Sequence, residues 1–223
     1  TEIGAAFEQA HPGVDVAFNF AGSQQLRAQL EQGARADVFA TAHSDEMESA
    51  WQKGLVLAGT ERVFAHNRLL LIYPRSNPGN LAALPDLARP GLKLVVAGKN
   101  VPVGKYTREA LARMSQDAAF GHDFAEKVLR NVVSEEDNVR QVVAKVRLGE
   151  ADAGFVYVSD VGPSVRPAVS TLAIPDTYNT VATYLIATLA ESAQPDLAQR
   201  FVDFVLSPTG QTILERHGLA HAK

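Results

Sequence analysis

The segment FNFAGSQQLRAQL, residues 18–30, joins a predicted strand to a predicted helix through Ala21-Gly22. Ser23 lies where the helix begins, and the nearest cation, Arg27, follows about one helical turn later. The first amides of a helix have no partner within it, and the aligned peptide dipoles make a helix start attractive to anions. The pattern therefore suggests an anion site that uses a hydroxyl and backbone amides rather than a charged side chain.

Two further predicted helix starts offer backbone amides of the same kind. In NVPVGKYTREAL, residues 100–111, a proline fixes the backbone, and the amides of Val103 and Gly104 open the helix. In SEEDNVRQ, residues 134–141, Val139 lies in the first turn of another helix. Both helix starts could donate hydrogen bonds to an oxyanion.

The same features also have an ordinary structural explanation. Serine is a common N-cap, so Ser23 could simply close its own helix. Glu135 and Glu136 would repel an anion unless they face solvent. We interpret these two residues, and the pair Asp45 and Glu46, as solvated acids near helix N-termini rather than as a catalytic pair.

The sequence gives little support to nucleotide binding or to nucleophilic catalysis. The motif VGKYT does not have the spacing of a phosphate-binding loop, because Tyr106 separates Lys105 from Thr107 and the upstream glycine is absent. No G-x-S-x-G motif occurs, and Ser23 has no evident histidine partner in the sequence. We therefore expect no catalytic residues.

The remaining polar residues of interest do not predict a metal centre. His43 beside Asp45 is the nearest approach to a ligand cluster, and the other five histidines are scattered. The absence of cysteine excludes thiolate sites and disulfides. Tyr157, in a predicted apolar strand, is by default a core tyrosine that needs a hydrogen-bond partner.

Length and charge narrow the function classes further. The chain has 223 residues, a net charge of −4 and a pI of about 5.9, which do not favour nucleic acid or an anionic membrane surface as a partner. No apolar run approaches the roughly 20 residues that span a bilayer, and these residues contain no signal-peptide pattern. The length predicts one or two domains.

Strand and helix patterns alternate along the chain, which is typical of an α/β fold. We expect strands at residues 14–20, 37–42, 68–73, 92–97, 154–158, 170–174 and 180–188. We expect helices at residues 1–10, 22–33, 44–53, 81–88, 104–115, 121–131, 136–148 and 195–217, the last interrupted at Ser207-Pro208. The long apolar strands near residues 70 and 184 bracket the middle of the chain, which predicts two lobes, residues 1–70 with 182–223 and residues 71–181.

Four blocks of sequence together resemble one known family. They are FNFAGSQQLRAQLEQGARADVFATA, NVPVGKYTREAL, DNVRQVVAKVRLGEADAGFVYVSD and FVDFVLSPTGQTILERHG. In order and wording they are similar to the periplasmic molybdate-binding proteins of ABC transporters. The resemblance covers nearly the whole chain and is far more specific than any single motif.

This resemblance implies both a fold and a set of ligand groups. Proteins of that family have two α/β lobes joined by a hinge, each lobe a mixed sheet flanked by helices, and molybdate or tungstate binds in the cleft between the lobes. Two serine hydroxyls, two backbone amides and a tyrosine hydroxyl hold the oxyanion. By motif position, the resemblance assigns four of these groups here: the hydroxyl of Ser23, the amides of Val103 and Val139, and the hydroxyl of Tyr157.

The chain departs from the family pattern at two positions. Many relatives have alanine where this chain has Val103; because the amide is the ligand, we expect binding to survive and the larger side chain to alter the pocket rim. The first serine of the family closes a strand that lies upstream of Thr1 and is absent from these 223 residues. We expect either weaker binding or stability in a molecule that lacks this strand, or a longer protein whose upstream residues supply it with a signal peptide.

The resemblance thus predicts a solute-binding protein, without enzyme activity or cofactor, that captures molybdate and tungstate for import through an ABC-transporter permease. It implies a periplasmic or extracytoplasmic location, with or without a lipid anchor, and we expect a monomer. One alternative is a protein of the same fold that binds another tetrahedral oxyanion such as sulfate. A second alternative is an enzyme acting on a phosphorylated substrate, which would need a charged acid–base pair that the sequence does not offer.

Overall fold

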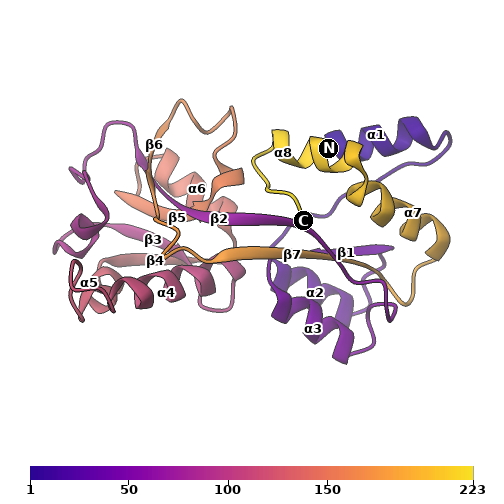
Figure 1. The fold of residues 1–223 in the computed structure, drawn as a ribbon, viewed down its shortest axis with the longest axis horizontal. Coiled ribbons are helices and arrows are strands. Elements are labelled where there is room, and N and C mark those ends of the chain that lie inside the picture. Colours follow the sequence, from indigo (N-terminus) through magenta and orange to yellow (C-terminus); the bar gives the residue numbers. More distant parts are fainter. Residues whose placement is uncertain (223) are drawn as a thin grey trace. The chain divides into compact units, whose positions relative to one another are not determined.

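The chain forms two compact units in a computed structural model that describes residues 1–222 (Figure 1). Unit 1 comprises residues 1–67 and the residues from 183 onward, and unit 2 comprises residues 68–182. Two strands, β2 (Arg62–Pro74) and β7 (Val181–Thr188), continue from one unit into the other. None of the helices in the described range is long and apolar enough to cross a membrane.

Unit 1 is built around a small antiparallel sheet. Its elements are α1 (Glu2–Ala10), α2 (Ser23–Glu31), β1 (Val38–Thr41), α3 (Ser44–Gln52), the first part of β2, most of β7, α7 (Pro195–Leu206) and α8 (Pro208–Arg216). Strands β1 and β7 pair in antiparallel register, with Phe39 opposite Ala187. In the strand order, β7 lies between β1 and β2.

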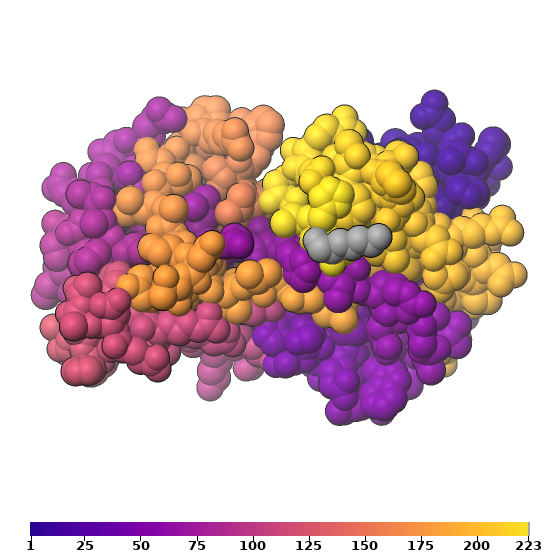
Figure 2. Space-filling view, viewed as in Figure 1, coloured from indigo at the N-terminus to yellow at the C-terminus, as the bar shows by residue number. Residues whose placement is uncertain are grey.

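Alternating side chains of these strands enter two hydrophobic clusters on opposite faces of the sheet. Phe39 and Ala187 pack with Met47 of α3 in one cluster. Ile186, the next residue along β7, packs with Val202 of α7 in the other cluster. Helices α2 and α3 therefore cover one face, whereas α7 covers the other together with α1 and α8, which lie side by side as the neighbouring indigo and yellow surfaces in Figure 2.

Unit 2 contains a mixed sheet in the strand order β6–β2–β5–β3–β4. Besides the rest of β2, its elements are the short 3₁₀ helix η1 (Leu84–Ala88), β3 (Leu94–Ala97), α4 (Pro102–Met114), α5 (Phe124–Arg130), β4 (Val132–Glu136), α6 (Val139–Arg147), β5 (Ala153–Tyr157), the 3₁₀ turn η2 (Val158–Asp160) and β6 (Val169–Ala173). Strand β2 runs antiparallel to β5 and β6, whereas β5, β3 and β4 are mutually parallel. Three neighbouring strands therefore end at the same edge of this sheet. Helix α4 follows β3, α6 follows β4, and the 3₁₀ turn η2 follows β5.

The core of unit 2 surrounds the two central parallel strands. Every residue of β3 and β5 is buried, as expected for parallel strands covered on both faces. Gly154 in β5 allows α6 to pack closely, because a Cβ at this position would lie 2.7 Å from Cγ1 of Val142. This close packing fixes α6, and with it the helix start that carries Val139, against the sheet.

Two sequence-based expectations of secondary structure are wrong. Residues 14–20 pair with no strand of the described chain, and Phe18 and Phe20 stack on each other at the surface with ring centroids 5.5 Å apart. Alternating apolar residues favour a strand, but a strand also needs a neighbour whose backbone completes the hydrogen bonds. Conversely, β4 was not expected, and the helix predicted at residues 136–148 begins only at Val139.

Candidate functional site

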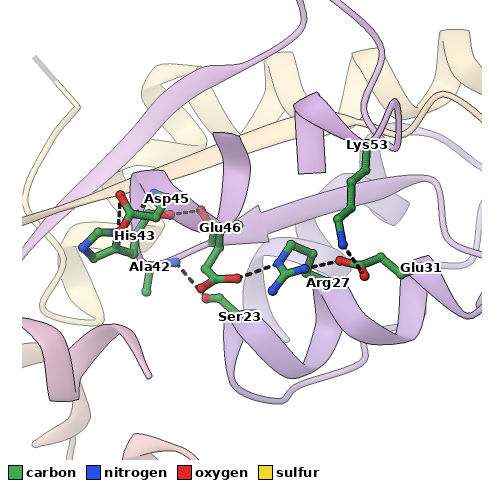
Figure 3. Close-up of polar contacts among 9 residues, drawn as sticks. Ser23, Arg27, Glu31, Ala42, His43, Asp45, Glu46 and Lys53 are labelled. Atoms are coloured by element: carbon green, nitrogen blue, oxygen red, sulfur yellow. Dashed lines mark hydrogen bonds and ion pairs between the residues drawn. The ribbon is translucent and has the colours of Figure 1, made fainter. Parts of the chain in front are cut away.

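Ser23 is the first residue of α2, but it is not the cap of that helix. The N-cap is Gly22, which has no side chain, and its N–H donates to Oε1 of Gln25 at 3.0 Å. Ser23 is only 7% exposed, and its Oγ accepts a hydrogen bond from the Ala42 N–H at 3.1 Å (Figure 3). This bond fixes the oxygen between α2 and the end of β1 and leaves the hydroxyl proton available to an acceptor.

The cation nearest to Ser23 in the sequence is neutralised by carboxylates. Arg27 Nε donates to Oε2 of Glu46 at 2.8 Å, and a second nitrogen of the guanidinium pairs with Glu31 (Figure 3). Lys53 Nζ lies 2.6 Å from the other oxygen of Glu31. The hydrogen bond from Arg27 to Glu46 is the main cause that raises the pKa of the guanidinium above its ordinary value.

The two carboxylates of the first turn of α3 have different environments. Glu46 is 6% exposed and pairs with Arg27, so its interpretation as a solvated acid is wrong. Its burial is tolerated because an opposite charge and a hydrogen bond accompany it. Asp45 does lie in solvent, and its N–H donates to Nδ1 of His43, the N-cap of α3.

In unit 2, helix α4 begins directly against the end of β3. Its N-cap is Val101 and its first residue is Pro102, so no side chain caps the following amides of Val103 and Gly104. A Cβ at Gly104 would lie 2.1 Å from the carbonyl oxygen of Gly98, so only glycine permits this approach. The sequence Val-Pro-x-Gly thus places two uncapped amides at the carboxyl edge of the sheet.

Helix α8 in unit 1 has the same Pro-x-Gly start with a different cap. A Cβ at Gly210 would lie 2.2 Å from the carbonyl oxygen of Phe204, which repeats the close approach found in α4. The N-cap of α8 is Ser207, however, and its Oγ accepts from the Gly210 N–H at 3.2 Å. The start of α8 is therefore closed by its own chain, whereas the start of α4 is not.

Polar side chains hold the first turn of α4 in place. Thr107 Oγ1 donates to the carbonyl oxygen of Val103 at 2.7 Å. Arg108 Nη1 donates to the carbonyl oxygens of Ala97 and Gly104 at 3.1 and 3.0 Å, and its Nη2 lies 2.6 Å from Oε1 of Glu135. The guanidinium thus ties the helix start to β3 while a carboxylate neutralises its charge.

The side chain of Val103 lies in the interior of unit 2. It is 1% exposed, which corrects the expectation that it would alter a pocket rim. The reason is geometric: at the second position of α4, the backbone N–H points along the helix axis while the side chain points into the core. The amide and the side chain of this residue therefore have separate roles.

Helix α6 begins in a similar way after β4. Asn138 is the N-cap, and its side chain accepts from the Gln141 N–H at 3.2 Å, while Oε1 of Gln141 accepts from the Asp137 N–H at 3.0 Å. This reciprocal capping uses the third amide of the helix, so the first amide, that of Val139, points outward from the helix start.

Glu136, just before α6, is buried rather than solvated, which is a further correction. Its Oε1 lies 2.6 Å from Lys145 Nζ and accepts from Ser134 Oγ at 2.6 Å. Burial by itself raises the pKa of this carboxyl, but the hydrogen bonds from Lys145 and Ser134 outweigh burial and lower the pKa below its ordinary value. An ionised Glu136 thus neutralises Lys145 of α6.

Tyr157 ends β5 at the same edge of the sheet. It is buried, as expected for a core tyrosine, and its ring meets Tyr106 of α4 edge-on with centroids 6.5 Å apart. Its N–H donates to Oδ2 of Asp160 at 2.8 Å. Burial raises the pKa of the Asp160 carboxyl to about 6, although the Tyr157 N–H and the charge of Arg140 act in the opposite direction.

Unit 2 therefore brings three of the four predicted groups to one edge. Val103 follows β3, Val139 follows β4, and Tyr157 ends β5, and these three strands are adjacent and parallel. The carboxyl ends of parallel strands are the usual place for ligands in α/β sheets. Ser23 belongs to unit 1, where it occupies an equivalent helix start.

The candidate donors are uncharged, and three cations near them are paired with carboxylates. The pairs are Arg27 with Glu46, Arg108 with Glu135, and Lys145 with Glu136. Within residues 1–222, no group of three or more histidine, aspartate or glutamate side chains could hold a metal ion. The arrangement is suited to binding an oxyanion through hydrogen bonds rather than to acid–base or metal chemistry.

Sequence reasoning missed the residues that support these donors. The Ala42 amide, which fixes Ser23 Oγ, lies 19 positions further along the chain, and Glu46 lies 19 positions beyond Arg27. No local pattern signals contacts at such separations. The spacing of Ser23 and Arg27 along one helical face is the one signal available, and it does not identify a partner.

The chain is similar to known proteins over almost its whole length. The profile of a family described as bacterial extracellular solute-binding protein matches residues 1–220. The molybdate-binding protein ModA of Mycobacterium tuberculosis is 42% identical over 220 residues, which are 99% of this chain and 79% of that protein.

Solved structures resemble the fold as well. The periplasmic molybdate-binding protein of Azotobacter vinelandii has a TM-score of 0.83 at 20% identity, covering 98% of this chain and 92% of that one. The sulfate-binding protein SubI of M. tuberculosis has a TM-score of 0.85 at 17% identity, covering 96% and 79%. At these identities the likeness concerns the fold alone, and it confirms the predicted α/β architecture of periplasmic binding proteins.

Proposed function

The chain belongs to the family of bacterial extracellular solute-binding proteins, and from this premise we propose that it captures molybdate outside the cytoplasm for import by an ABC transporter. Proteins of this family bind a solute for transport, so the chain is a binding protein and not an enzyme. The ligand in our proposal is the transported cargo, and no cofactor takes part. The ModA relative, 42% identical over almost the entire chain, supports the choice of molybdate.

We propose that Ser23 Oγ, the amides of Val103 and Val139 and the hydroxyl of Tyr157 donate hydrogen bonds to the oxyanion. The observation that carries this proposal is that neutral donors lie at three strand ends and at the start of α2, while Arg27, Arg108 and Lys145 are each paired with a carboxylate. Hydrogen bonds from neutral groups to a charged acceptor are strong when the donors are fixed in advance.

Neutral donors suit molybdate for a specific chemical reason. Molybdate is a full dianion near neutral pH, so it needs only donors around it. Phosphate carries a proton at that pH, and a site made of donors would leave that proton without an acceptor, at a cost of about 1–3 kcal/mol. Sulfate has the charge and shape of molybdate but is smaller, so discrimination between the two depends on how far apart the fixed donors are.

Tungstate has the same charge, shape and nearly the same size as molybdate. We therefore propose that the protein binds tungstate as well. We further propose that it acts as a monomer, and that its protein partner is the membrane permease of the same transporter.

Calorimetric titration of the chain with molybdate, tungstate and sulfate tests this function. We expect molybdate and tungstate to bind at least about tenfold more tightly than sulfate, and Ser23→Ala to weaken molybdate binding by about tenfold or more, since a hydrogen bond to a charged group contributes about 1.5–3 kcal/mol. Ser44→Ala is the matched control, because Ser44 is the exposed first residue of the neighbouring helix α3.

Absent binding, or equal affinity for all three anions, would reject the molybdate assignment. A preference for sulfate would select the alternative, a receptor of the same fold for another tetrahedral oxyanion.

A further inference from the structure

A buried carboxylate of α3 pairs with Arg27, one helical turn after Ser23. Glu46 of α3 is 6% exposed, and its Oε2 accepts from Arg27 Nε at 2.8 Å (Figure 3). We propose that Glu46 is a specificity-determining residue: it holds the guanidinium of Arg27 away from the oxyanion and cancels its charge. This inference rests on the proposed function, because it concerns the same anion site.

The geometry places the two contacts in series along one helix interface. Ser23 and Arg27 are four residues apart and share a face of α2. Their partners, Ala42 and Glu46, are also four residues apart, one at the end of β1 and one in the first turn of α3. The segment of residues 42–46 thus holds the hydroxyl at one end and the guanidinium at the other.

The natural direction of the Arg27 side chain makes this restraint necessary. Side chains on a helix lean toward its N-terminus, over the preceding turn. For Arg27 that turn contains Ser23, so an arginine without Glu46 would extend toward the hydroxyl and the uncapped start of α2. Glu46 approaches from the neighbouring helix, and Figure 3 draws its carboxylate between Ser23 and Arg27, so the guanidinium ends on Glu46 rather than at the hydroxyl.

Charge balance gives Glu46 a second effect. Arg27 and Lys53 supply two positive charges, and Glu31 and Glu46 supply two negative charges, so the cluster is neutral as a whole. The two carboxylates are not equivalent. Glu31 also pairs with Lys53 and is more exposed, whereas Glu46 pairs with Arg27 and is buried. Removing Glu46 leaves one uncompensated positive charge beside a site for a dianion.

An arginine at the site would weaken size discrimination. Fixed amides and hydroxyls cannot follow a smaller anion inward, so they favour the larger molybdate. A flexible guanidinium can close the remaining gap around sulfate and donate two hydrogen bonds to it. We therefore expect sulfate to gain more than molybdate when Arg27 is released.

The test compares Glu46→Ala with the double variant Arg27→Met/Glu46→Ala in calorimetric titrations with molybdate and with sulfate. We expect Glu46→Ala to reduce the molybdate-to-sulfate affinity ratio by about tenfold, and the double variant, which lacks the guanidinium, to restore the ratio of the parent. Glu31→Gln is the matched control, because it also removes one negative charge from Arg27 but leaves the Glu46 contact; its ratio should stay within about twofold of the parent.

A purely structural role for the pair makes a different prediction. In that case Glu46→Ala would lower the melting temperature but leave the affinity ratio unchanged, and this result would overturn the inference. If Glu46→Ala does not fold, Glu46→Gln retains the shape of the side chain and leaves the positive charge of Arg27 uncompensated. Its molybdate affinity should then fall more steeply with NaCl concentration than that of the parent. An unchanged salt dependence would also overturn the inference. The parent titration tests the proposed function separately, since a parent that prefers sulfate contradicts molybdate capture whatever the variants do.

Discussion

Replacing Gly104 by alanine should damage binding more than stability. The added Cβ would lie 2.1 Å from the carbonyl oxygen of Gly98 and 2.4 Å from that of Ala97. Both atoms belong to the backbone at the end of β3, which cannot rotate away as a side chain would. Ordinary contact begins near 3.4 Å, so the first turn of α4 must move by more than about 1 Å.

The magnitude follows from two opposing terms. Overpacking of this kind costs about 1–3 kcal/mol, and alanine recovers up to about 1 kcal/mol through its higher helix propensity. We expect a net loss of about 1–2 kcal/mol in the free energy of unfolding. Under the proposed function, the displaced Val103 amide loses a hydrogen bond to an anion, which is worth about 1.5–3 kcal/mol or roughly a 10- to 100-fold loss of affinity.

Urea unfolding measures the first quantity, and calorimetric titration with molybdate measures the second. Gly98→Ala is the matched control, because a Cβ at Gly98 would meet its nearest neighbour, the carbonyl oxygen of Glu136, at an ordinary 3.7 Å. Unchanged affinity in Gly104→Ala, or an equal loss in Gly98→Ala, would refute the argument that the close approach of α4 to β3 places the amide.

Two further predictions concern the side chain of Val103 and the effect of Asp160 on the pH dependence of stability. Val103→Ala should keep molybdate affinity within about twofold, because the amide remains, while urea unfolding should show a loss of about 1–3 kcal/mol from the emptied core position; a large loss of affinity would contradict this separation. Asp160 has a pKa raised from 3.8 to about 6 in the folded state, so between these pH values the folded protein keeps a proton that the unfolded chain releases, and stability falls as pH rises through this window. In urea unfolding at several pH values, Asp160→Asn should therefore gain stability relative to the parent from about pH 4 to 6, whereas parallel curves would count against a buried Asp160 carboxyl.

Much of the fold could be predicted because the strongest sequence patterns agree with the tertiary contacts. The apolar run at residues 68–73 lies in β2, and residues 154–158 give β5 with its end displaced by one residue, since central strands buried on both faces need continuous apolar side chains. The sequence does not predict strand β4, because Ser134, Glu135 and Glu136 have the pattern of a solvated helix start. It forms because Lys145 and Arg108 neutralise its acids, and these partners come from α6 and α4.

The candidate site shows the same division between local and distant information. Helix starts near Ser23, Val103 and Val139 could be predicted from local patterns, but not to the residue: the predicted starts are residues 22, 104 and 136, and the helices begin at Ser23, Pro102 and Val139. The partners that fix Ser23 and Arg27 could not be predicted from the sequence. The Ala42 amide and the Glu46 carboxylate belong to a different strand–helix segment of the chain. Charge pairing across 19 positions is a property of the packed chain, so an acidic residue in the sequence reveals neither its burial nor its partner.

The contrast between the starts of α4 and α8 links ligand capture to the integrity of unit 2. At α8 the chain supplies its own cap through Ser207, whereas at α4 the cap position is Val101, whose side chain has no polar atom. A missing side-chain cap typically leaves a helix about 1 kcal/mol less stable. Under the proposed function the oxyanion takes the place of that cap, so we expect bound molybdate to raise the stability of unit 2 as well as to be carried by it.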